Sequence, residues 1–569
     1  MPFLIGTRTV FVPGAYAITN IINEGGSVIP VFNVGVIVAE AAEGLPYTVG
    51  TGGTPAMTAD EFIKPYADVA SMKRDKGSEG NSPMVRAMRY AKAGGAGTVF
   101  ALNVRPLTPV TLGEIQNVTP VKALTISTTG KKYGAAANHI SITIAAYVHT
   151  IIGPKNITHL TVEGATGQPT VTVADVRDYK AGDSVYIAAN DTAPVAHEIE
   201  TVNATAKTIT FTANLAATLA LAQYPVIYQE DTENQEVSSE ALDTVDKVTA
   251  FYGNSAYCNA AIASGITIMP ITLTKTYLNA LTNAVDATSP AATGTDWQNV
   301  ADDFARWNEE FAIVNKVYMR ILNLVTGDDA NHASFVALAT TMRTNNKPIA
   351  LVSGCVLGDY TLSNGDEPPA RALALNSDEI QLAGFGADGY DPYLSYGPYI
   401  FGIRVGSAVN HNQTADLLGN GVFLTVEKAF YRDDPALEVY VKAGVMAIIM
   451  DKFGYKIVQG VTTYQDQTTT FNTNSRKTYL VALRDLADFD LRVMMELLDQ
   501  YAGADNVTKE SVANAVMGSS EILKNDLLYI SGYAIQSITK KPSGWEVKRK
   551  IGLDSPTDFI GLINNIVID

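Results

Sequence analysis

Acidic and histidine side chains come together at one point of the sequence, in the run GDDANH. Asp328, Asp329 and His332 follow an apolar segment typical of a β-strand and precede a helical pattern. Carboxylate and imidazole groups are metal ligands, so a metal site is one interpretation. The aspartates are equally well explained as the cap of the helix, where carboxylates accept free backbone N–H groups. We expect the capping role and assign no metal here.

Two glycine-containing segments have some likeness to phosphate-binding loops. The glycines of AKAGGAGTVF lie between a predicted helix and a predicted strand, whereas a dinucleotide-binding loop lies between a strand and a helix. We expect them to end the helix. In STTGKKYG, Gly130 and Lys131 lack a glycine five positions earlier, and Lys132 stands where Ser or Thr is needed. Neither segment predicts a nucleotide site.

Catalytic motifs are also missing from the sequence. It holds no nucleophile elbow, no HExxH motif and no paired cysteines at metal-ligand spacing. We therefore assign no catalytic, metal or cofactor-binding residues, and we expect a protein that is not an enzyme and needs no cofactor. An α/β enzyme without a recognisable motif, for example a hydrolase using Asp328 or Asp329, stays open as an alternative.

The composition is that of a large, acidic, globular protein. The chain has 569 residues, of which 47% are hydrophobic and 17% charged, so two to four domains are expected. Its net charge of −17 repels phosphate backbones, which argues against nucleic acid as a direct partner. Cys258 and Cys355 lie among small or apolar residues and predict two buried thiols.

Neither a targeting segment nor a membrane helix is predicted. The N-terminus has no basic region, and Pro13-Gly14 interrupts its apolar run, so it is not a signal peptide. The least charged long stretch, TITFTANLAATLALAQYPVIY, is rich in Thr and contains Pro225, which favours strands. We expect an aqueous compartment and no membrane insertion.

Strand-like segments stand at both ends of the chain. Residues 1–25 form an arm, TVFVPGAYAITNI, whose Pro13-Gly14 break is tolerated only at an edge or a bulge. The closing GLINNIVID is apolar on both faces, and the chain stops before this strand can turn back. Both strands therefore need a sheet to join.

Between the arms, the pattern is mixed α/β with a β-rich interruption. VFNVGVIVAE predicts a strand buried on both faces, residues 43–80 an exposed loop, and SPMVRAMRYAKAGG a helix before the strand GTVFALNV. Residues 160–230 carry short strands, with a hairpin signature in ETVNATAKTITF. After residue 231 the α/β pattern resumes, and the helix DWQNVADDFARWNEEF has one apolar face. That face consists of Trp297, Val300, Phe304, Trp307 and Phe311.

The predicted fold class is α/β, or α+β, and multidomain, with an inserted all-β domain and extended strand arms. Strand, helix and strand at 317–354 predict a parallel βαβ unit. A hairpin near 452–454, two helices and a hairpin at 528–553 follow. The predicted domains are an N-terminal arm (1–25), a first core part (26–159), an inserted all-β outer domain (160–230), a second core part (231–555) and a C-terminal arm (556–569).

The last predicted hairpin, TKKPSGWEVKRK, is basic in an otherwise acidic chain. Such a run is usually a solvated face. Here it flanks a strand that needs a partner, so we also expect it to dock on an acidic neighbour of the same kind. The candidate docking charges are Lys540, Lys541, Lys548, Arg549 and Lys550.

The order of segments resembles the contractile tail sheath family of bacteriophages and related injection systems. VPGAYAITN is similar to the opening arm of that family, IPVFNVGVIVAEAAEGLP to its first core strand and loop, and GTVFALNVRP to the next strand. KKYGAAANHISITI, VQGVTTYQ and DFIGLINNIVID resemble later family segments, the last being the C-terminal strand. The likeness covers most of the chain outside 160–230, which resembles a family-variable insertion.

The resemblance implies a structural role. Subunits of this family form homopolymeric rings or helices around an inner tail tube, with baseplate and tail terminator proteins as further partners. They are assembled in the host cytoplasm, belong to the virion tail, and contract to drive the tube through the host envelope for DNA ejection. Arms from neighbours join their sheets. The implied arm residues are Val10, Val12, Ala15, Ala17 and Ile18 near the start and Ile560, Leu562, Ile563, Ile566, Val567 and Ile568 near the end.

A β-domain surface, coat or adhesion protein is the main competing interpretation. It would explain the β-rich insertion and the acidity. It would not explain α/β segments on both sides of that insertion or strand-like arms at both ends.

Overall fold

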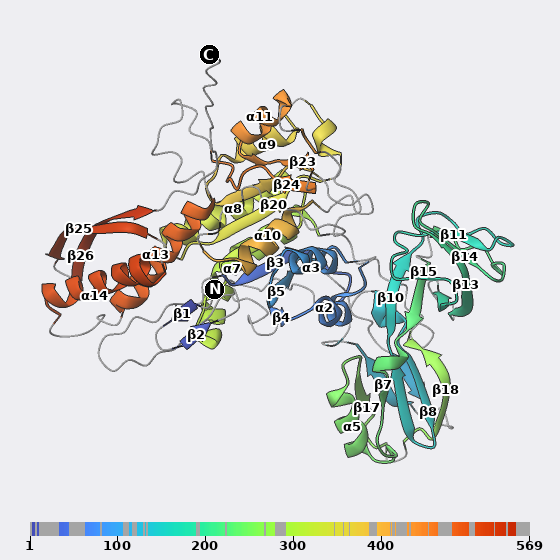
Figure 1. Ribbon diagram of the computed structural model, residues 1–569. Helices are drawn as coiled ribbons and strands as arrows, with labels where there is room; N and C mark the ends of the chain where they lie inside the picture. Colours follow the sequence, from blue (N-terminus) through green and yellow to red (C-terminus); the bar gives the residue numbers. More distant parts are fainter. Residues whose placement is uncertain are drawn as a thin grey trace. The chain divides into compact units, whose positions relative to one another are not determined.

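The chain divides into two compact units in the computed structural model (Figure 1). The first unit comprises Met1–Ile37, Tyr90–Phe100 and Phe304–Asp569, and the second comprises Val38–Arg89 and Ala101–Asp303. The structure describes residues 3–5, 8–10, 33–44, 63–79, 82–105, 113–116, 122–128, 131, 135–188, 194–221, 225–266, 269–278, 292–345, 347–356, 358–363, 365–385, 395–409, 411, 413, 416, 429–431, 434–452, 454–464, 481–499, 507–527, 530–541 and 544–553.

A seven-stranded sheet organises the α/β part, in the order β22-β21-β20-β19-β3-β5-β4. The pairs β19–β20, β20–β21 and β21–β22 are parallel, and every residue of β3 is buried, as its apolar run predicted. The strands are β3 (Gly35–Ala39), β4 (Lys64–Tyr66), β5 (Val99–Asn103), β19 (Ile321–Leu324), β20 (Ala350–Gly354), β21 (Ile380–Ala383) and β22 (Val445–Met446).

The predicted helices around this sheet are present. All five members of the apolar face predicted from Trp297 to Phe311 are buried in α7 (Gly294–Asn315). β19, α8 (Asp329–Thr344) and β20 form the predicted parallel βαβ unit. The other helices in this part of the chain are α3 (Pro83–Ala93), α9 (Pro368–Leu375), α10 (Gly397–Gly406) and α11 (Pro435–Lys442).

The glycines after α3 serve two purposes. Gly95 has a left-handed φ of 102° and ends the helix, as predicted. Gly94 is needed because α10 approaches closely: a Cβ there would lie 2.3 Å from the carbonyl oxygen of Tyr399. In the same way, a Cβ on Gly402 would lie 2.1 Å from the carbonyl oxygen of Ala91. The two backbones meet where neither has a side chain.

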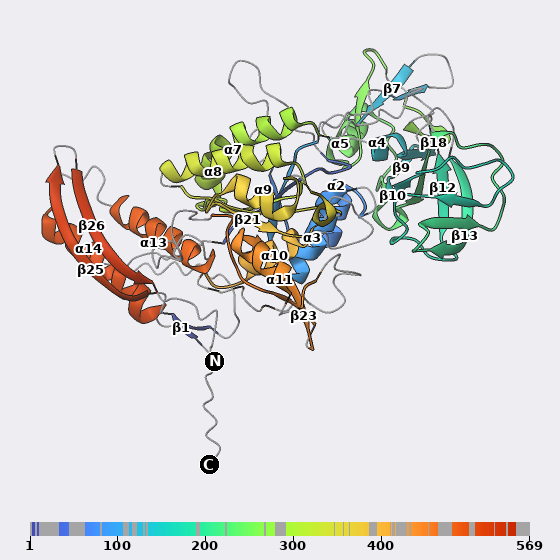
Figure 2. The ribbon, with the colours of Figure 1, turned by 90° about the horizontal axis from the view of Figure 1, so that it is seen from above.

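The C-terminal part of the first unit consists of two helices and a long hairpin (Figure 2). α13 (Val481–Asp499) and α14 (Lys509–Glu521) are followed by a π-helical turn, Ile522–Asp526. β25 (Ile530–Lys541) then pairs with β26 (Gly544–Leu553).

Two shorter hairpins are β1 (Phe3–Ile5) with β2 (Arg8–Val10), and β23 (Ile448–Asp451) with β24 (Gly454–Ile457). The hairpins near 452–454 and in 528–553 confirm the sequence prediction.

The second unit holds a six-stranded antiparallel sheet in the order β10-β15-β12-β13-β14-β11. The β13–β14 hairpin confirms the prediction from ETVNATAKTITF. The sheet has a core of its own, which includes Val185, Ile199, Ile209, Phe211 and Ile227. The strands are β10 (Pro154–His159), β11 (Thr170–Thr172), β12 (Ser184–Ala188), β13 (Val195–Asn203), β14 (Thr208–Phe211) and β15 (Val226–Glu230).

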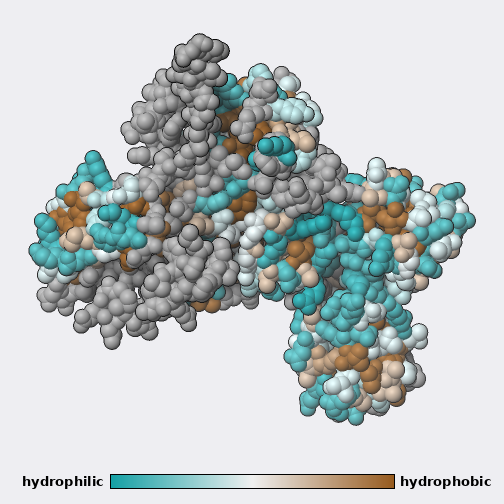
Figure 3. Space-filling model, in the orientation of Figure 1, coloured by the Kyte–Doolittle hydropathy of each residue, from teal (hydrophilic) through white to brown (hydrophobic). Residues whose placement is uncertain are grey.

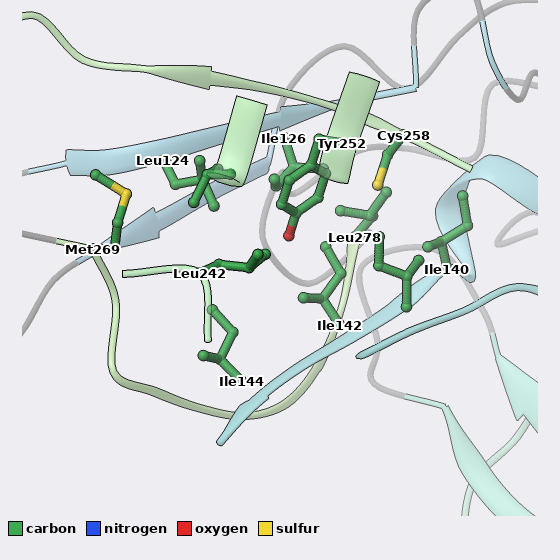
Figure 4. Close-up of a cluster of buried hydrophobic side chains, with 12 residues drawn as sticks. Leu124, Ile126, Ile140, Ile142, Ile144, Leu242, Tyr252, Cys258, Met269 and Leu278 are labelled. Carbon is green, nitrogen blue, oxygen red and sulfur yellow. The ribbon is translucent and has the colours of Figure 1, made fainter. Parts of the chain in front are cut away.

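A second apolar cluster lies in the same unit, between two smaller sheets and α5 (Val245–Asn254). In Figure 4, Tyr252 and Cys258 lie among leucine and isoleucine side chains. Both cysteines are buried and free, as predicted, and burial raises the pKa of the Cys258 thiol to about 12. The elements are β6 (Gly113–Gln116), β7 (Lys122–Ser127) and β17 (Asn259–Ile262) in one sheet, β8 (Ser141–Ala145), β9 (Val148–Ile152), β16 (Glu236–Val237) and β18 (Thr272–Tyr277) in the other, and the short α4 (Ala135–Asn138).

The expectation of an exposed loop over residues 43–80 is wrong for its second half. Residues Val69–Lys76 form α2, and the Asp68 carboxylate caps it by accepting the Ser71 N–H at 2.7 Å. Lys73 binds Asp178 at 2.9 Å, and Glu79 is buried. The charges that suggested exposure are held by ion pairs instead.

The mixed α/β, multidomain fold class is confirmed. Within the described ranges, none of the helices combines the length and apolar character that a membrane crossing requires.

Candidate assembly interface

The β25–β26 hairpin has the form of an unfinished sheet. Its strands of 12 and 10 residues pair antiparallel, and no third strand joins them among the described residues. A two-stranded hairpin is marginally stable by itself, and each open edge presents unpaired backbone groups to another strand. As far as the described part of the chain goes, the hairpin therefore offers two long edges on which strands can add.

One face of the hairpin is supported by α13 and α14. Ile530 of β25 packs in a cluster with Leu486, Phe489 and Val493 of α13 and with Leu523. The Tyr533 hydroxyl donates to Glu521 at 2.5 Å, which raises the pKa of the tyrosine. These contacts leave the opposite face of the hairpin outward.

A buried ion pair fastens β26 to the two helices. The Arg549 guanidinium donates to Asp490 Oδ1 of α13 at 2.5 Å and to Ser520 Oγ of α14 at 2.6 Å. Only 8% of the Arg549 side chain and 11% of the Asp490 side chain are exposed. Burial raises the pKa of Asp490 despite the lowering effect of Arg549. Of the predicted docking charges, Arg549 is thus bound within its own chain.

The other docking charges have different positions. Lys540, Lys548 and Lys550 are exposed, and Lys548 lies 3.8 Å from Glu546. The Lys541 side chain lies outside the described part of the structure. Docking by the four lysines stays a prediction.

A second ionic cluster attaches α13 to the parallel sheet. Asp485 accepts from Arg320, just before β19, at 2.5 Å, and from Arg404 Nε of α10 at 2.8 Å. Arg320, Arg404 and Asp485 are almost fully buried. Burial favours the neutral carboxyl, but the two guanidiniums outweigh it and lower the pKa of Asp485.

The same cluster continues one helical turn further along α13. Asp488 accepts from Arg343 Nη1 of α8 at 2.7 Å, and burial raises the pKa of this aspartate against the lowering effect of Arg320 and Arg343. Glu379, just before β21, binds Arg343 and also Arg484, the latter at 2.9 Å. α13 thus joins the hairpin through apolar contacts and the Arg549–Asp490 ion pair, and it joins the part of the chain around the parallel sheet through Asp485 and Asp488.

Sequence reasoning missed these ionic contacts. The signal that could have found them is the placement of Asp485, Asp488 and Asp490 beside the apolar residues Leu486, Phe489 and Val493 of the same predicted helix. Acidic residues on the apolar face of a helix require cations when the helix packs. The partners themselves lie far away in the sequence and could not be named from it.

The predicted arm residues lie mostly outside the described residues. Val10 ends β2, where its backbone pairs with Phe3. The prediction for the ten remaining arm residues is not tested. These are Val12, Ala15, Ala17, Ile18, Ile560, Leu562, Ile563, Ile566, Val567 and Ile568.

The GDDANH run has structural partners. Asp328 caps α8 by accepting the Ala330 N–H at 2.8 Å, as expected. Asp329 binds Arg371 at 2.6 Å, and the fully buried His332 contacts Ser353 Oγ at 2.7 Å. Across the residues that the structure describes, no three His, Cys, Asp or Glu side chains gather as metal ligands.

Comparison with known proteins gives structural matches and no sequence match. No protein-family model and no curated protein matches the sequence. The crystal structure of a sheath tail protein from Desulfitobacterium hafniense matches with a TM-score of 0.52 and 10% identity, over 94% of this chain and 100% of that one. A sheath tail protein from Listeria innocua matches with a TM-score of 0.50 and 12% identity, over 92% of each chain.

These matches extend over nearly the whole chain and include both compact units. The chain has the fold of the solved sheath tail proteins.

Proposed function

We propose that this chain is the structural subunit of a contractile tail sheath, a homopolymer that surrounds an inner tail tube. The observation that carries the proposal is the open β25–β26 hairpin, braced by buried contacts on a fold shared with sheath tail proteins. A long two-stranded sheet of this kind is completed when strands from other subunits add to it.

Strand addition would link subunits through their arms. Residues 1–25 and 556–569 carry the apolar, β-prone segments that need a sheet, and the hairpin has two edges to receive them. Main-chain hydrogen bonds would supply directional affinity, while side chains of alternating orientation would fix the register. Gly25, Gly26 and Pro556 provide turn chemistry at the arm boundaries.

Contraction would use the same links. Rigid cores rotate and slide while the arms keep neighbours connected, and the sheath drives the tube through the host envelope for DNA ejection. The sequence holds no nucleotide-binding motif, so the energy would be stored at assembly and released as cores form better contacts. Calorimetry of extended tails should show an exothermic, irreversible transition; an endothermic, reversible one would contradict this mechanism.

The proposed partners follow from that role. They are further copies of the chain, the inner tube protein, and baseplate and tail terminator proteins, in a virion tail assembled in the host cytoplasm. Neither nucleic acid nor a membrane is a direct partner in this proposal, and no catalytic step is part of it.

The test is to express the chain alone and view it by negative-stain electron microscopy. Tubes of uniform width support a sheath subunit. A monodisperse monomer at high concentration would contradict the proposal and favour a β-domain surface protein or an α/β enzyme.

A further inference from the structure

We propose that the groove between β16 and α5 in the second unit binds an extended, cationic peptide segment of a partner protein. The segment carries two lysine or arginine side chains four residues apart, with an apolar side chain midway between them. The site uses no residue of the hairpin or of the arms, so it does not depend on tube formation.

The groove lies between an edge strand and a helix. β16 stands at the end of its sheet and, among the described residues, pairs with β9 alone. The hollow between β16 and α5 has a volume of about 710 Å³, which is within the range of ligand-binding pockets. Extended peptides bind in such grooves by adding main-chain hydrogen bonds to the edge strand and placing alternate side chains in the hollow.

Val237 provides the open edge of β16. The Ser238 N–H donates to the carbonyl oxygen of His149 on β9 at 2.9 Å. Hydrogen-bonded and non-bonded residue pairs alternate along antiparallel strands, so the backbone N–H and C=O of Val237 point away from β9. The side chain of this residue is also accessible, since 49% of Val237 is exposed. One donor and one acceptor can therefore pair with an added strand.

One stripe of α5 forms the opposite wall of the groove. Its residues follow one another at intervals of three and four, and they are Lys247, Ala250, Phe251 and Asn254. Ala250 is exposed and Phe251 is half-buried, so the middle of this wall is apolar and accessible. The part of the second unit that holds α5, at the bottom of Figure 3, shows a hydrophobic area bordered by hydrophilic residues. The middle of the groove suits an apolar side chain.

The lining of the groove is acidic. It contains three carboxylates, those of Glu236, Glu240 and Asp246, and one ammonium group, that of Lys247, which gives a net charge of −2. The Lys247 ammonium is bound by Glu240 at 3.1 Å and by Asp243 at 2.9 Å. Within the described ranges, Glu236 and Asp246 have no cationic partner. These two carboxylates favour a cationic ligand.

The Glu236 carboxylate gives the most specific sign of a ligand. Its Oε1 accepts the Ala256 N–H, just beyond the end of α5, at 2.7 Å. Its Oε2 is buried, and no group in the described part of the chain donates a hydrogen bond to it. Buried polar atoms are nearly always hydrogen-bonded, because leaving them without a partner is costly. A lysine or arginine side chain in the groove would supply the donor.

The positions of the two unpaired carboxylates set the spacing in the ligand. Asp246 lies in the first turn of α5, whereas Glu236 is bound at Ala256, and residues 246 to 256 of a helix extend over about 15 Å. An extended segment rises about 3.3 Å per residue, so side chains four residues apart lie on one face, roughly 13 Å from each other. The side chain midway between them lies on the same face, where it would meet Ala250 and Phe251.

Binding of a synthetic peptide to the purified full-length chain tests the site. The probe is fluorescein-labelled Ser-Lys-Ser-Leu-Ser-Lys-Ser with an amidated end, and binding is measured by fluorescence anisotropy. A second peptide has its lysines three residues apart, which places them on opposite faces of an extended segment. The protein variants are Glu236→Gln, which keeps an acceptor for the Ala256 N–H, and Asp246→Asn. Glu233→Gln, an exposed change outside the groove, is the matched control, and circular dichroism checks folding.

The probe is expected to bind the wild-type chain and the control variant equally. Glu236→Gln should weaken binding at least about tenfold, because a buried carboxylate oxygen loses its charge. Asp246→Asn should weaken it about threefold, because that carboxylate is exposed to solvent. The peptide with shifted lysines should bind at least about tenfold more weakly than the probe.

Three results would overturn the inference. The first is a probe that does not bind the folded wild-type chain at millimolar concentration. The second is unchanged binding in both acidic-residue variants. The third is equal binding of the peptide with shifted lysines, or equally strong competition by spermidine, since either would show attraction by charge without a groove of defined spacing. None of these results bears on tube formation, so the proposed function is tested separately.

Discussion

Arg549 of β26 is bound to Asp490 of α13 in a largely buried ion pair, and its second nitrogen reaches Ser520 of α14. One side chain therefore ties the hairpin to both supporting helices. In a sheath, a neighbour's arm would exert a force on the hairpin. This ion pair would transmit that force to α13, and the ion pairs of Asp485 and Asp488 would transmit it from α13 to the part of the chain around the parallel sheet.

Replacing Arg549 with Met should loosen the hairpin. The change keeps an aliphatic chain but leaves Asp490 buried without its cation, which costs about 3 kcal/mol. Amide hydrogen exchange across 530–553 should become faster by roughly a hundredfold, as that free energy implies. Adding Asp490→Leu should restore much of the protection, because both buried charges are then gone. Unchanged exchange in the single variant would contradict a supporting role for the pair.

Asp485 should make the first unit sensitive to acid. Its pKa is lowered in the fold by Arg320 and Arg404, so its stabilising effect is present above the ordinary aspartate value of 3.8 and is lost as the pH falls below it. Asp485→Asn should lower the thermal midpoint at pH 7, and the gap to wild type should narrow toward pH 3. A gap that is constant with pH would show that the carboxylate charge is not the stabilising feature.

The close approach of α10 to the end of α3 predicts that Gly402 tolerates no side chain. In Gly402→Ala the new Cβ would lie 2.1 Å from the backbone oxygen of Ala91, so the helices must separate, at a cost of about 2 kcal/mol. Gly518→Ala is the matched control, because no atom lies within 4 Å of that Cβ position in α14. Gly518→Ala should raise the free energy of unfolding by about 0.5–1 kcal/mol, because alanine has a higher helix propensity than glycine. Equal effects in denaturant unfolding would contradict the packing argument.

Strands β11 to β14 of the six-stranded sheet should be separable from assembly. His159 and Val226 are paired neighbours on β10 and β15, so residues 160–225 can be replaced by a short Gly-Ser linker without moving either end. The excision removes β11 to β14 and leaves β10 paired with β15, and most of the buried cluster around Val185, Ile199, Ile209 and Phe211 is removed with it. The shortened chain should therefore fold and should still form tubes. Failure to polymerise, with the remaining fold intact by circular dichroism, would show that the sheet contributes to subunit contacts.

Local patterns in the sequence predicted much of the fold. The apolar face from Trp297 to Phe311 follows helical spacing, and the buried strand β3 is a continuous apolar run, so each is visible within a few residues. The final hairpin was likewise evident from two β-prone runs around a Pro-Ser-Gly turn. In these cases the physical cause of the structure lies inside the segment itself.

The ionic contacts of α13 could not be predicted in this way. Arg320 and Asp485 are 165 residues apart, and which arginine meets which aspartate depends on how α13 packs on the sheet. The helix α2 could not be predicted for a related reason. Its charged sequence is typical of a solvated loop, and the ion pair between Lys73 and the distant Asp178 is visible only in the folded structure. The inward orientation of Arg549 among outward lysines also depends on tertiary packing.

Deletion of residues 556–569 tests whether the C-terminal arm links one subunit to the next. The truncated chain and the full-length chain are compared by negative-stain microscopy and circular dichroism at the same concentration. We expect the full-length protein to form tubes of uniform width, and the truncated protein to keep the same folded spectrum and form no tubes. Tubes from the truncated protein would contradict the claim that this arm links one subunit to the next.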